Sequence, residues 1–313
     1  MRKTLFIAAV LLMGLAIKSR AQQSIVYSQY IFNGLLINPA YAGSHVQLSV
    51  ALTYRNQWVN FEGAPQTATL GAHTALKRNK VGVGMLVTND RIGSYSNTGL
   101  FGSYAYMIRW PTGGVLSMGI QAGFNNFRAD YNELSIRPVS QNDPLFSSFI
   151  NQFKPNFGGG LFYYNKAMFV GFAVPTILTY KKSFSENLQQ LSQPRYYYLH
   201  GGALLPLNRT ETVKFNPSVL FRVQDGTPLS ADINLNFVLY DMVSVGTSYR
   251  MGDAIMAFTN FKLSQKFYVG YSYDWTTSDI RRYSNGTHEI QISYRTPIRQ
   301  IHGNIECPSY FHH

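Results

Sequence analysis

Strict alternation of apolar and polar residues is the feature that most constrains the fold of this chain. Within residues 46–55, one parity carries Val46, Leu48, Val50, Leu52 and Tyr54, and the other carries Gln47, Ser49, Ala51, Thr53 and Arg55. A period of two predicts a β-strand whose two faces meet different surroundings. The same pattern recurs at 231–239, 242–250, 266–275 and 288–295.

The alternation divides residues 46–296 into fourteen candidate strands. Serial glycines in the fifth and sixth, among them Gly119, Gly123 and Gly158, make the faces of those two less certain. The strands are expected near 46–55, 66–77, 80–90, 97–110, 114–127, 155–165, 167–175, 195–207, 212–224, 228–240, 242–251, 254–264, 266–276 and 286–296.

The connections between these strands sort by length. Every second connection is short, for example "KRN" at 77–79 and "SQK" at 264–266, whereas the long ones, 129–154, 176–194 and 277–285, all belong to the other set. Short turns at one end and long loops at the other are typical of outer-membrane barrels, in which the long loops are extracellular.

Strands with one apolar and one polar face are stable in a membrane when the apolar face contacts lipid. Charged residues make up only 13% of the chain, against about 25% in soluble domains. In hydrocarbon every backbone N–H and C=O must be paired within the protein, so the sheet has to close. The sequence therefore predicts an all-β fold, a transmembrane antiparallel β-barrel of about fourteen strands with long extracellular loops.

Three segments lie outside this predicted barrel. Residues 1–21 have the charged start, short apolar run and small-residue end of a signal peptide. Residues 22–45 do not alternate, and Ile31, Leu35 and Leu36 predict a short amphipathic helix that ends before Pro39. We interpret 22–45 as an N-terminal plug or periplasmic segment, with a disordered leader as the alternative. Residues 297–313 form a C-terminal tail.

By parity, several charged side chains point into the barrel. They predict either an ionic network that fills the lumen or an anion-selective channel. Large inward side chains such as Phe162, Met256 and Phe258 favour the filled lumen. The residues proposed for this lumen network are Arg55, Arg222, Asp232, Arg250, Asp274 and Glu289.

Extracellular loops are then the expected partner-binding sites. Gly63 and Pro65 indicate a rigid turn within "EGAPQT", residues 62–67. The 129–154 loop carries more apolar side chains than a solvated loop needs, and with 176–194 it could grip a partner's β-domain. The alternative is that these side chains fold the loop over the barrel mouth. The side chains are Tyr131, Phe146, Phe149 and Phe153.

No catalytic or metal-binding constellation is evident. His73, His200 and His288 are isolated in the sequence, and no Gly-x-Ser-x-Gly motif occurs. We therefore expect no enzyme activity, cofactor or metal. The net charge of +12 arises from scattered basic residues, so nucleic acid is not an expected partner. The single cysteine, Cys307, permits no intramolecular disulfide.

Several motifs resemble, in order, those of one family. They include "YSQYIFNGLLINPAYAGS" (27–44), "YRNQWVNFEGAPQTATLGAH" (54–73), "YVGYSYDWTTSDI" (268–280) and "THEIQISY" (287–294). The chain is similar to the PorP/SprF family of outer-membrane proteins, which accompany the type IX secretion system in Bacteroidetes. The specific signature combines Gln57, Trp58, the Gly63-Ala64-Pro65 turn and Thr67 with His288 and Glu289.

The resemblance implies an outer-membrane role in protein secretion and gliding motility. The implied partners are a secreted cargo protein with a C-terminal type IX signal domain, such as a surface adhesin, other machinery components, and outer-membrane lipid. The family supplies no catalytic residues. The alternative function is a passive channel for small or hydrophobic solutes.

Overall fold

The computed structural model describes residues 26–76, 79–111, 113–129, 150–182, 191–224 and 227–296, and it confirms the predicted antiparallel barrel. The signal peptide and the C-terminal tail lie outside the described residues. The barrel strands are β1 (Leu48–Asn56), β2 (Gln66–Leu76), β3 (Val81–Ile92), β4 (Tyr95–Arg109), β5 (Val115–Ala129), β6 (Ile150–Tyr164), β7 (Met168–Val174), β10 (Tyr196–Ala203), β12 (Val213–Gln224), β13 (Ser230–Leu239), β14 (Val243–Arg250), β15 (Ala254–Lys262), β16 (Phe267–Thr276) and β17 (Thr287–Thr296).

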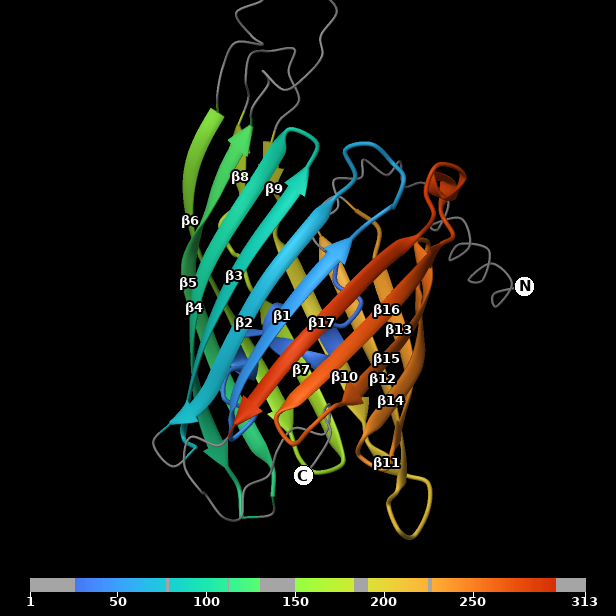
Figure 1. Ribbon diagram of the computed structural model, residues 1–313. Helices are drawn as coiled ribbons and strands as arrows, with labels where there is room; N and C mark the ends of the chain where they lie inside the picture. Colours follow the sequence, from blue (N-terminus) through green and yellow to red (C-terminus); the bar gives the residue numbers. More distant parts are fainter. Residues whose placement is uncertain are drawn as a thin grey trace, which may run out of the picture.

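These fourteen described strands form a closed sheet. Each strand pairs with its neighbour in the barrel, the first with the last through the β1–β17 seam, and β10 pairs with β12. Figure 1 shows the strands tilted around one axis. The short strand β11 (Leu205–Pro206) follows β10 and also pairs with β12, while β8 (Tyr180–Lys182) and β9 (Leu191–Gln193) form a separate hairpin. Closure pairs the backbone groups of the edge strands, as a hydrocarbon surrounding requires.

Side-chain exposure follows the predicted parity. On β1, Leu52 is 50% exposed whereas the adjacent Thr53 is 1% exposed. The outer face is apolar and the inner face polar, which is the reverse of a soluble β-sandwich. Aromatic side chains near strand ends are exposed on the outside, among them Tyr54, Tyr106, Trp110, Tyr240, Tyr249 and Trp275.

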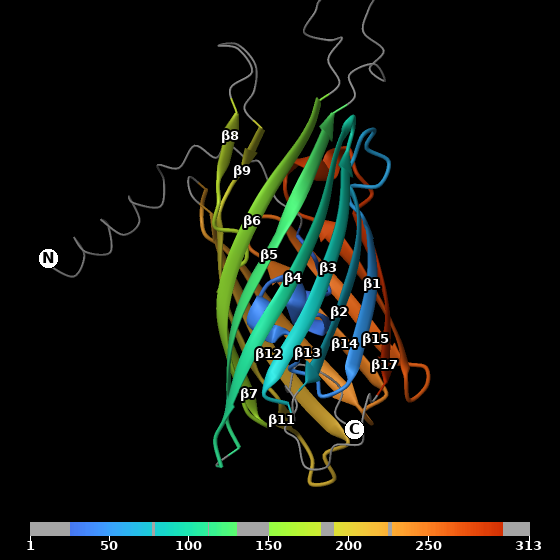
Figure 2. The ribbon, with the colours of Figure 1, turned by 90° about the vertical axis from the view of Figure 1, so that its left-hand side faces the viewer.

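The barrel wall is higher on one side than on the other. Strands β4, β5 and β6 each have 15 residues, whereas β7 has 7 and β10 has 8. Figure 2 shows β3–β6 reaching higher than the other barrel strands at the end that carries the 130–149 connection. The predicted end of the 129–154 loop was therefore wrong, because β6 begins at residue 150. Phe153 lies on the outer face of that strand, where its ring centroid is 4.4 Å from that of Phe124.

Residues 26–45, which we call the inner segment, lie inside the barrel (Figure 2). All except Ile31 and Leu36 are buried. The predicted single amphipathic helix is wrong: the segment forms three 3₁₀ turns, η1 (Tyr30–Phe32), η2 (Gly34–Leu36) and η3 (Pro39–Tyr41). Asn33 and Asn38, with φ of −146° and −142°, interrupt the helical backbone between the turns. No helix in the described part of the chain is long and apolar enough to span a membrane.

Candidate functional site

The inner segment runs through the lumen from the long-loop end to the short-turn end. Ser28 contacts Asp274 and Glu289, which lie on β16 and β17 beside the 277–286 connection. At the other end, Gly43 lies against Gly82, the second residue of β3, beside the short turn at 79–80. The segment therefore crosses most of the barrel before the chain enters β1.

A group of buried hydrogen bonds holds the start of the inner segment to the wall. We call this group, Ser28, Gln29, Arg55, Asp274 and Glu289, the seam latch. The carboxylate of Glu289 accepts hydrogen bonds from two successive backbone N–H groups, Ser28 at 2.9 Å and Gln29 at 2.8 Å. The Ser28 hydroxyl donates to Asp274 at 2.7 Å.

Arg55 supplies the positive charge in the seam latch. Its guanidinium lies 2.9 Å from Asp274 and 2.9 Å from Glu289, and it donates to the Ser28 hydroxyl at 2.8 Å. All three charged side chains are at most 3% exposed. Because β1 pairs with β17 at the closure, the latch joins both sides of the seam to the inner segment. Removing one partner of such a buried pair typically destabilises a protein by about 3–5 kcal/mol.

A second ion pair stands beside the seam latch. Arg250 on β14 binds Asp232 on β13 through Nε at 3.0 Å and Nη2 at 3.0 Å, and both side chains are 1% exposed. Arg250 Nη2 also donates to the carbonyl of Tyr27 at 3.1 Å. Arg222 lies apart from these groups and donates to the Ser230 hydroxyl. Tyr27, Ser28 and Gln29, at the start of the inner segment, are thus all held to the wall by hydrogen bonds with charged side chains.

Glycines on the wall make room for the rest of the inner segment. A Cβ on Gly82 would overlap the carbonyl of Ala42, and a Cβ on Gly119 would overlap the backbone of Pro39 and Ala40. Gly160, on β6, would overlap the Asn38 side chain in the same way. The segment therefore approaches these three strands more closely than any larger residue would allow, with its backbone at Gly82 and Gly119 and with a side chain at Gly160.

Asn38 connects this part of the inner segment to two strands. Its Oδ1 accepts from the backbone N–H of Ala40 at 2.9 Å and so caps η3. Its Nδ2 donates to the carbonyl of Leu161 on β6 at 3.0 Å and lies 3.3 Å from Nε2 of His200 on β10. The Asn-Pro-Ala motif thus combines a cap, two wall contacts and a close approach to Gly119.

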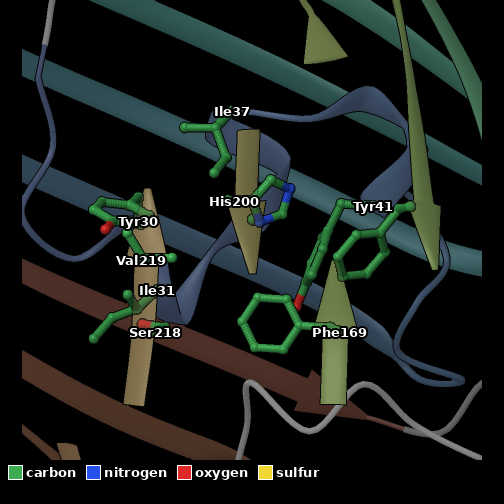
Figure 3. A pocket seen from close by; sticks show the side chains of 10 residues that line it. Tyr30, Ile31, Ile37, Tyr41, Phe169, His200, Ser218 and Val219 are labelled. Carbon is green, nitrogen blue, oxygen red and sulfur yellow. The ribbon is translucent and has the colours of Figure 1, made fainter. Parts of the chain in front are cut away.

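A small cavity lies between the inner segment and β6, β7, β10 and β12 (Figure 3). Its lining includes Tyr30 and Ile37 from the segment and Phe169 and His200 from the wall. The His200 ring stacks on Phe162 at a centroid distance of 5.4 Å. The cavity volume of about 20 Å³ leaves room for about one water molecule. It is a packing gap at the interface of segment and wall.

The predicted site residues fall into different parts of the structure. The structure brings together Arg55, Asp274 and Glu289 in one group, and Arg250 and Asp232 in the next. Sequence reasoning missed Ser28, Gln29 and Asn38; the low polarity of the segment and its Asn-Pro-Ala motif were the available signals. Within the described residues, no three His, Cys, Asp or Glu side chains cluster in a way that could hold a metal ion.

The predicted rigid turn lies at the long-loop end. Gly63 has φ of +74°, and its carbonyl accepts from the N–H of Gly93 at 3.0 Å. The carbonyl of Pro65 accepts from the N–H of Gln57 at 3.0 Å. Val59 exchanges two backbone hydrogen bonds, each 2.9 Å, with residues 285 and 286. Tyr131, Phe146 and Phe149 lie outside the described residues.

Solved structures with a similar fold include outer-membrane barrels. One is a KdgM porin, 10% identical, with a TM-score of 0.37 over 79% of this chain and 98% of that chain. A second is the TodX deltaS2S3 mutant, a monoaromatic hydrocarbon channel, 9% identical, with a TM-score of 0.46 over 88% of this chain and 95% of that chain. A third is a Pseudomonas aeruginosa FadL homologue, 11% identical, with a TM-score of 0.46 over 85% of this chain and 93% of that chain. No curated protein matches the chain.

The family comparison covers most of the sequence. The profile of the type IX secretion system membrane protein PorP/SprF matches residues 19–294, which include the inner segment and nearly the whole barrel. An outer-membrane barrel fold and membership of a secretion-system membrane family agree with each other. The chain belongs to the PorP/SprF family of type IX secretion system membrane proteins.

Proposed function

We propose that this barrel binds a secreted cargo protein, or another component of the type IX machinery, at its long-loop end. The cargo would be a protein with a C-terminal type IX signal domain, such as a surface adhesin. The observation that carries the proposal is the filled lumen. Because the inner segment occupies the interior, recognition falls to the loops that face the cell exterior.

The filled lumen also weighs against the alternative of a passive channel. The seam latch and the Arg250–Asp232 pair bind residues 27–29 in the long-loop half of the lumen. Residues 38–43 pack against wall glycines in the other half. A solute path would require the inner segment to leave both sets of contacts, and we infer that the segment acts as a permanent plug.

The loops at 57–65 and 277–286 and the turn at Gly93, which together we call the rim, offer a preorganised surface for a partner. Backbone hydrogen bonds tie the loop at 57–65 to residues 285–286 and to Gly93, so the loops hold one another in place. Two aromatic side chains stand out from them, Phe61 at 43% exposure and Tyr283 at 69% exposure. Rigid exposed aromatic residues lose little entropy on binding, and such residues are enriched at interface hot spots.

Deletion of the gene tests the proposed role. Cells that lack the barrel should keep the cognate cargo inside, as measured by proteolysis of intact cells followed by immunoblotting, while cargo of other barrels still reaches the surface. Normal display of every type IX cargo in the deletion strain would contradict the proposal.

Complementation with variants then tests the rim. The variant Phe61→Ala/Tyr283→Ala should restore the barrel to the membrane but lower cargo display by at least about tenfold, since interface anchors of this kind contribute about 2 kcal/mol each. The matched control is Tyr240→Ala/Met242→Ala, which removes two exposed side chains from the short-turn end. Equal display in both variants would place the binding surface elsewhere.

We also infer that the barrel is not an enzyme. Two of the three isolated histidines contact the inner segment: the backbone N–H of Gly43 donates to His73 at 3.2 Å, and His200 lies against Asn38. The third, His288, lies 2.7 Å from the hydroxyl of Tyr271 on the neighbouring strand β16. Lipase or protease activity that disappears on changing His73, His200 or His288 would contradict this inference.

A further inference from the structure

Charged side chains are rare on the outer face of the barrel, and they are not evenly distributed. Cross-strand pairing assigns each described strand residue to one face. Among the outward positions of the fourteen barrel strands, no Lys, Asp or Glu occurs in the described residues, and arginine occurs only at Arg91 and Arg128. A charge on the lipid face costs about 2–4 kcal/mol at mid-depth and little near the interfaces. The position of these two arginines is therefore informative.

Both arginines lie in one row across neighbouring strands. Arg91 pairs with Ser96, and Ser96 pairs with Arg128, so the two arginines flank one residue on the same face. Two strand spacings separate their Cα atoms, about 10 Å. The row continues with a polar residue on either side. We call it the outer arginine row: Gln66, Arg91, Ser96, Arg128 and Asn151.

A second polar row separates the outer arginine row from the apolar band. It contains Asn89, Thr98 and Asn126, and the Asn89 side chain donates to the Thr98 hydroxyl at 2.9 Å. The next outward row, with Leu100 and Phe124, is apolar. Arg91 and Arg128 thus stand about 13 Å along the strands from the apolar band, or about 10 Å in height after the usual tilt. That height corresponds to the headgroup layer.

The rest of the barrel circumference differs. At the long-loop end, the outward positions of the opposite wall carry apolar or aromatic residues, for example Val223, Tyr249, Ile255 and Trp275. The second polar row therefore lies on β3–β5, and the outer arginine row lies on β2–β6 and continues through Asn56 on β1 and His288 on β17.

We propose that the outer arginine row binds the phosphate groups of an anionic lipid in the outer leaflet, with its acyl chains against the apolar band below. Arg91 and Arg128 are both exposed and provide planar donor groups that suit phosphate oxygens. Ser96 and the amides of Gln66 and Asn151 add neutral donors for the sugar or phosphate oxygens between the two arginines. A lipid that carries two phosphates about 10 Å apart can occupy both arginines.

Lipid fits this face better than a protein partner does. The outer arginine row points sideways from the wall rather than toward the mouth, and the apolar band, which begins below the second polar row, would contact acyl chains. The row contains cationic and neutral donors and no acidic residue, which complements a purely anionic ligand. A protein partner that bound here would have to displace the lipid that surrounds the barrel.

Lipid retention by the purified full-length protein tests the proposal. The wild type and the variant Arg91→Gln/Arg128→Gln are reconstituted in phosphatidylcholine nanodiscs with diphosphoryl lipid A or with dephosphorylated lipid A, and bound lipid is counted by native mass spectrometry. The control is Arg281→Gln/Arg282→Gln, which removes two exposed arginines from the 3₁₀ turn η6 (Asp279–Arg282) at the same end. For each variant, a difference in gel mobility between unheated and heated samples verifies that the barrel is folded.

The wild type and the η6 control should retain diphosphoryl lipid A, and the row variant should bind it at least about tenfold more weakly, because charge-assisted contacts are lost. Dephosphorylated lipid A should bind all three proteins equally weakly. Equal retention of diphosphoryl lipid A by the row variant and the control would overturn the proposal. Unchanged lipid retention with a loss of co-purified cargo would also overturn it and would make the row a protein-docking face.

Discussion

The two halves of the inner segment are held in the lumen by different physical means. Near the long-loop end, Ser28 and Gln29 are bound by buried carboxylates and by Arg55. Near the short-turn end, residues 38–43 pack with their backbone against glycines such as Gly82 and Gly119, and few charges take part. The first half depends on hydrogen-bond geometry and the second on the absence of side chains.

This difference implies different responses to mutation. A buried ion pair is highly sensitive to the loss of one partner, because the remaining charge is left without compensation. A close-packed backbone contact is insensitive to polarity but sensitive to a single added carbon atom. The following variants distinguish the two halves, in order of decreasing expected effect.

The largest effect is expected from Glu289→Ala in the seam latch. The change removes the acceptor of two backbone N–H groups and leaves Arg55 with Asp274 alone, so the free energy of unfolding should fall by about 3–5 kcal/mol. The measurement is the denaturant midpoint of the barrel in lipid vesicles. Glu62→Ala, at an exposed position of the rim, is the control. Equal midpoints for the two variants would show that the latch does not stabilise the barrel.

The next effect belongs to the close-packed half. Gly119→Ala places a Cβ against the backbone of Pro39 and Ala40, and the strain should lower the free energy of unfolding by about 1–3 kcal/mol. Gly102→Ala is the matched control on the next strand, where a Cβ meets only the carbonyl of Ala122 at 4.0 Å. The fraction of heat-modifiable folded protein provides the readout. If Gly102→Ala destabilised the barrel and Gly119→Ala did not, the assignment of Gly119 to the inner face and of Gly102 to the outer face would be wrong.

A smaller effect is expected from Asn38→Ala. The variant loses the cap of η3 and the contacts with Leu161 and His200, which should cost about 1–2 kcal/mol. Asn38→Ser sharpens the result, because serine can cap the turn but cannot reach the wall. If the serine variant has the stability of the wild type, the wall contacts of Asn38 contribute nothing.

The smallest effect is expected from Ser28→Ala. The hydroxyl bridges Arg55 and Asp274, but the backbone contacts with Glu289 remain, so the loss should be about 1 kcal/mol. Ser278→Ala is the control, because the Ser278 side chain makes no capping hydrogen bond. A loss as large as that of Glu289→Ala would mean that the hydroxyl, rather than the carboxylate, organises the latch.

The sequence predicted the barrel well because parity is a local property. Strand β13 was expected at 228–240 and spans Ser230–Leu239, and its Asp232 is buried on the inner face. Glycines obscured the signal where it mattered most: Gly119 and Gly160 lack a side chain whose polarity could mark a face. The inner segment touches the wall at both of these positions.

The candidate site was predicted only in part, because parity does not specify depth or partner. Arg55, Asp274 and Glu289 were all placed in the lumen, but their meeting depends on the seam, which joins residues 219 and 234 positions apart in the chain. The course of the inner segment follows from contacts of Ser28 with strands at the far end of the sequence. No pattern within residues 26–45 contains that information.

Planar-bilayer recording of the purified full-length protein tests most directly whether the lumen is filled. With residues 26–45 held at both ends, we expect no steady conductance in the wild type across a range of voltages. Because the seam latch holds one end of the segment, Glu289→Ala should show more transient openings than Glu62→Ala. A stable open conductance of the wild type would contradict the account, since it would require a continuous aqueous path past the inner segment.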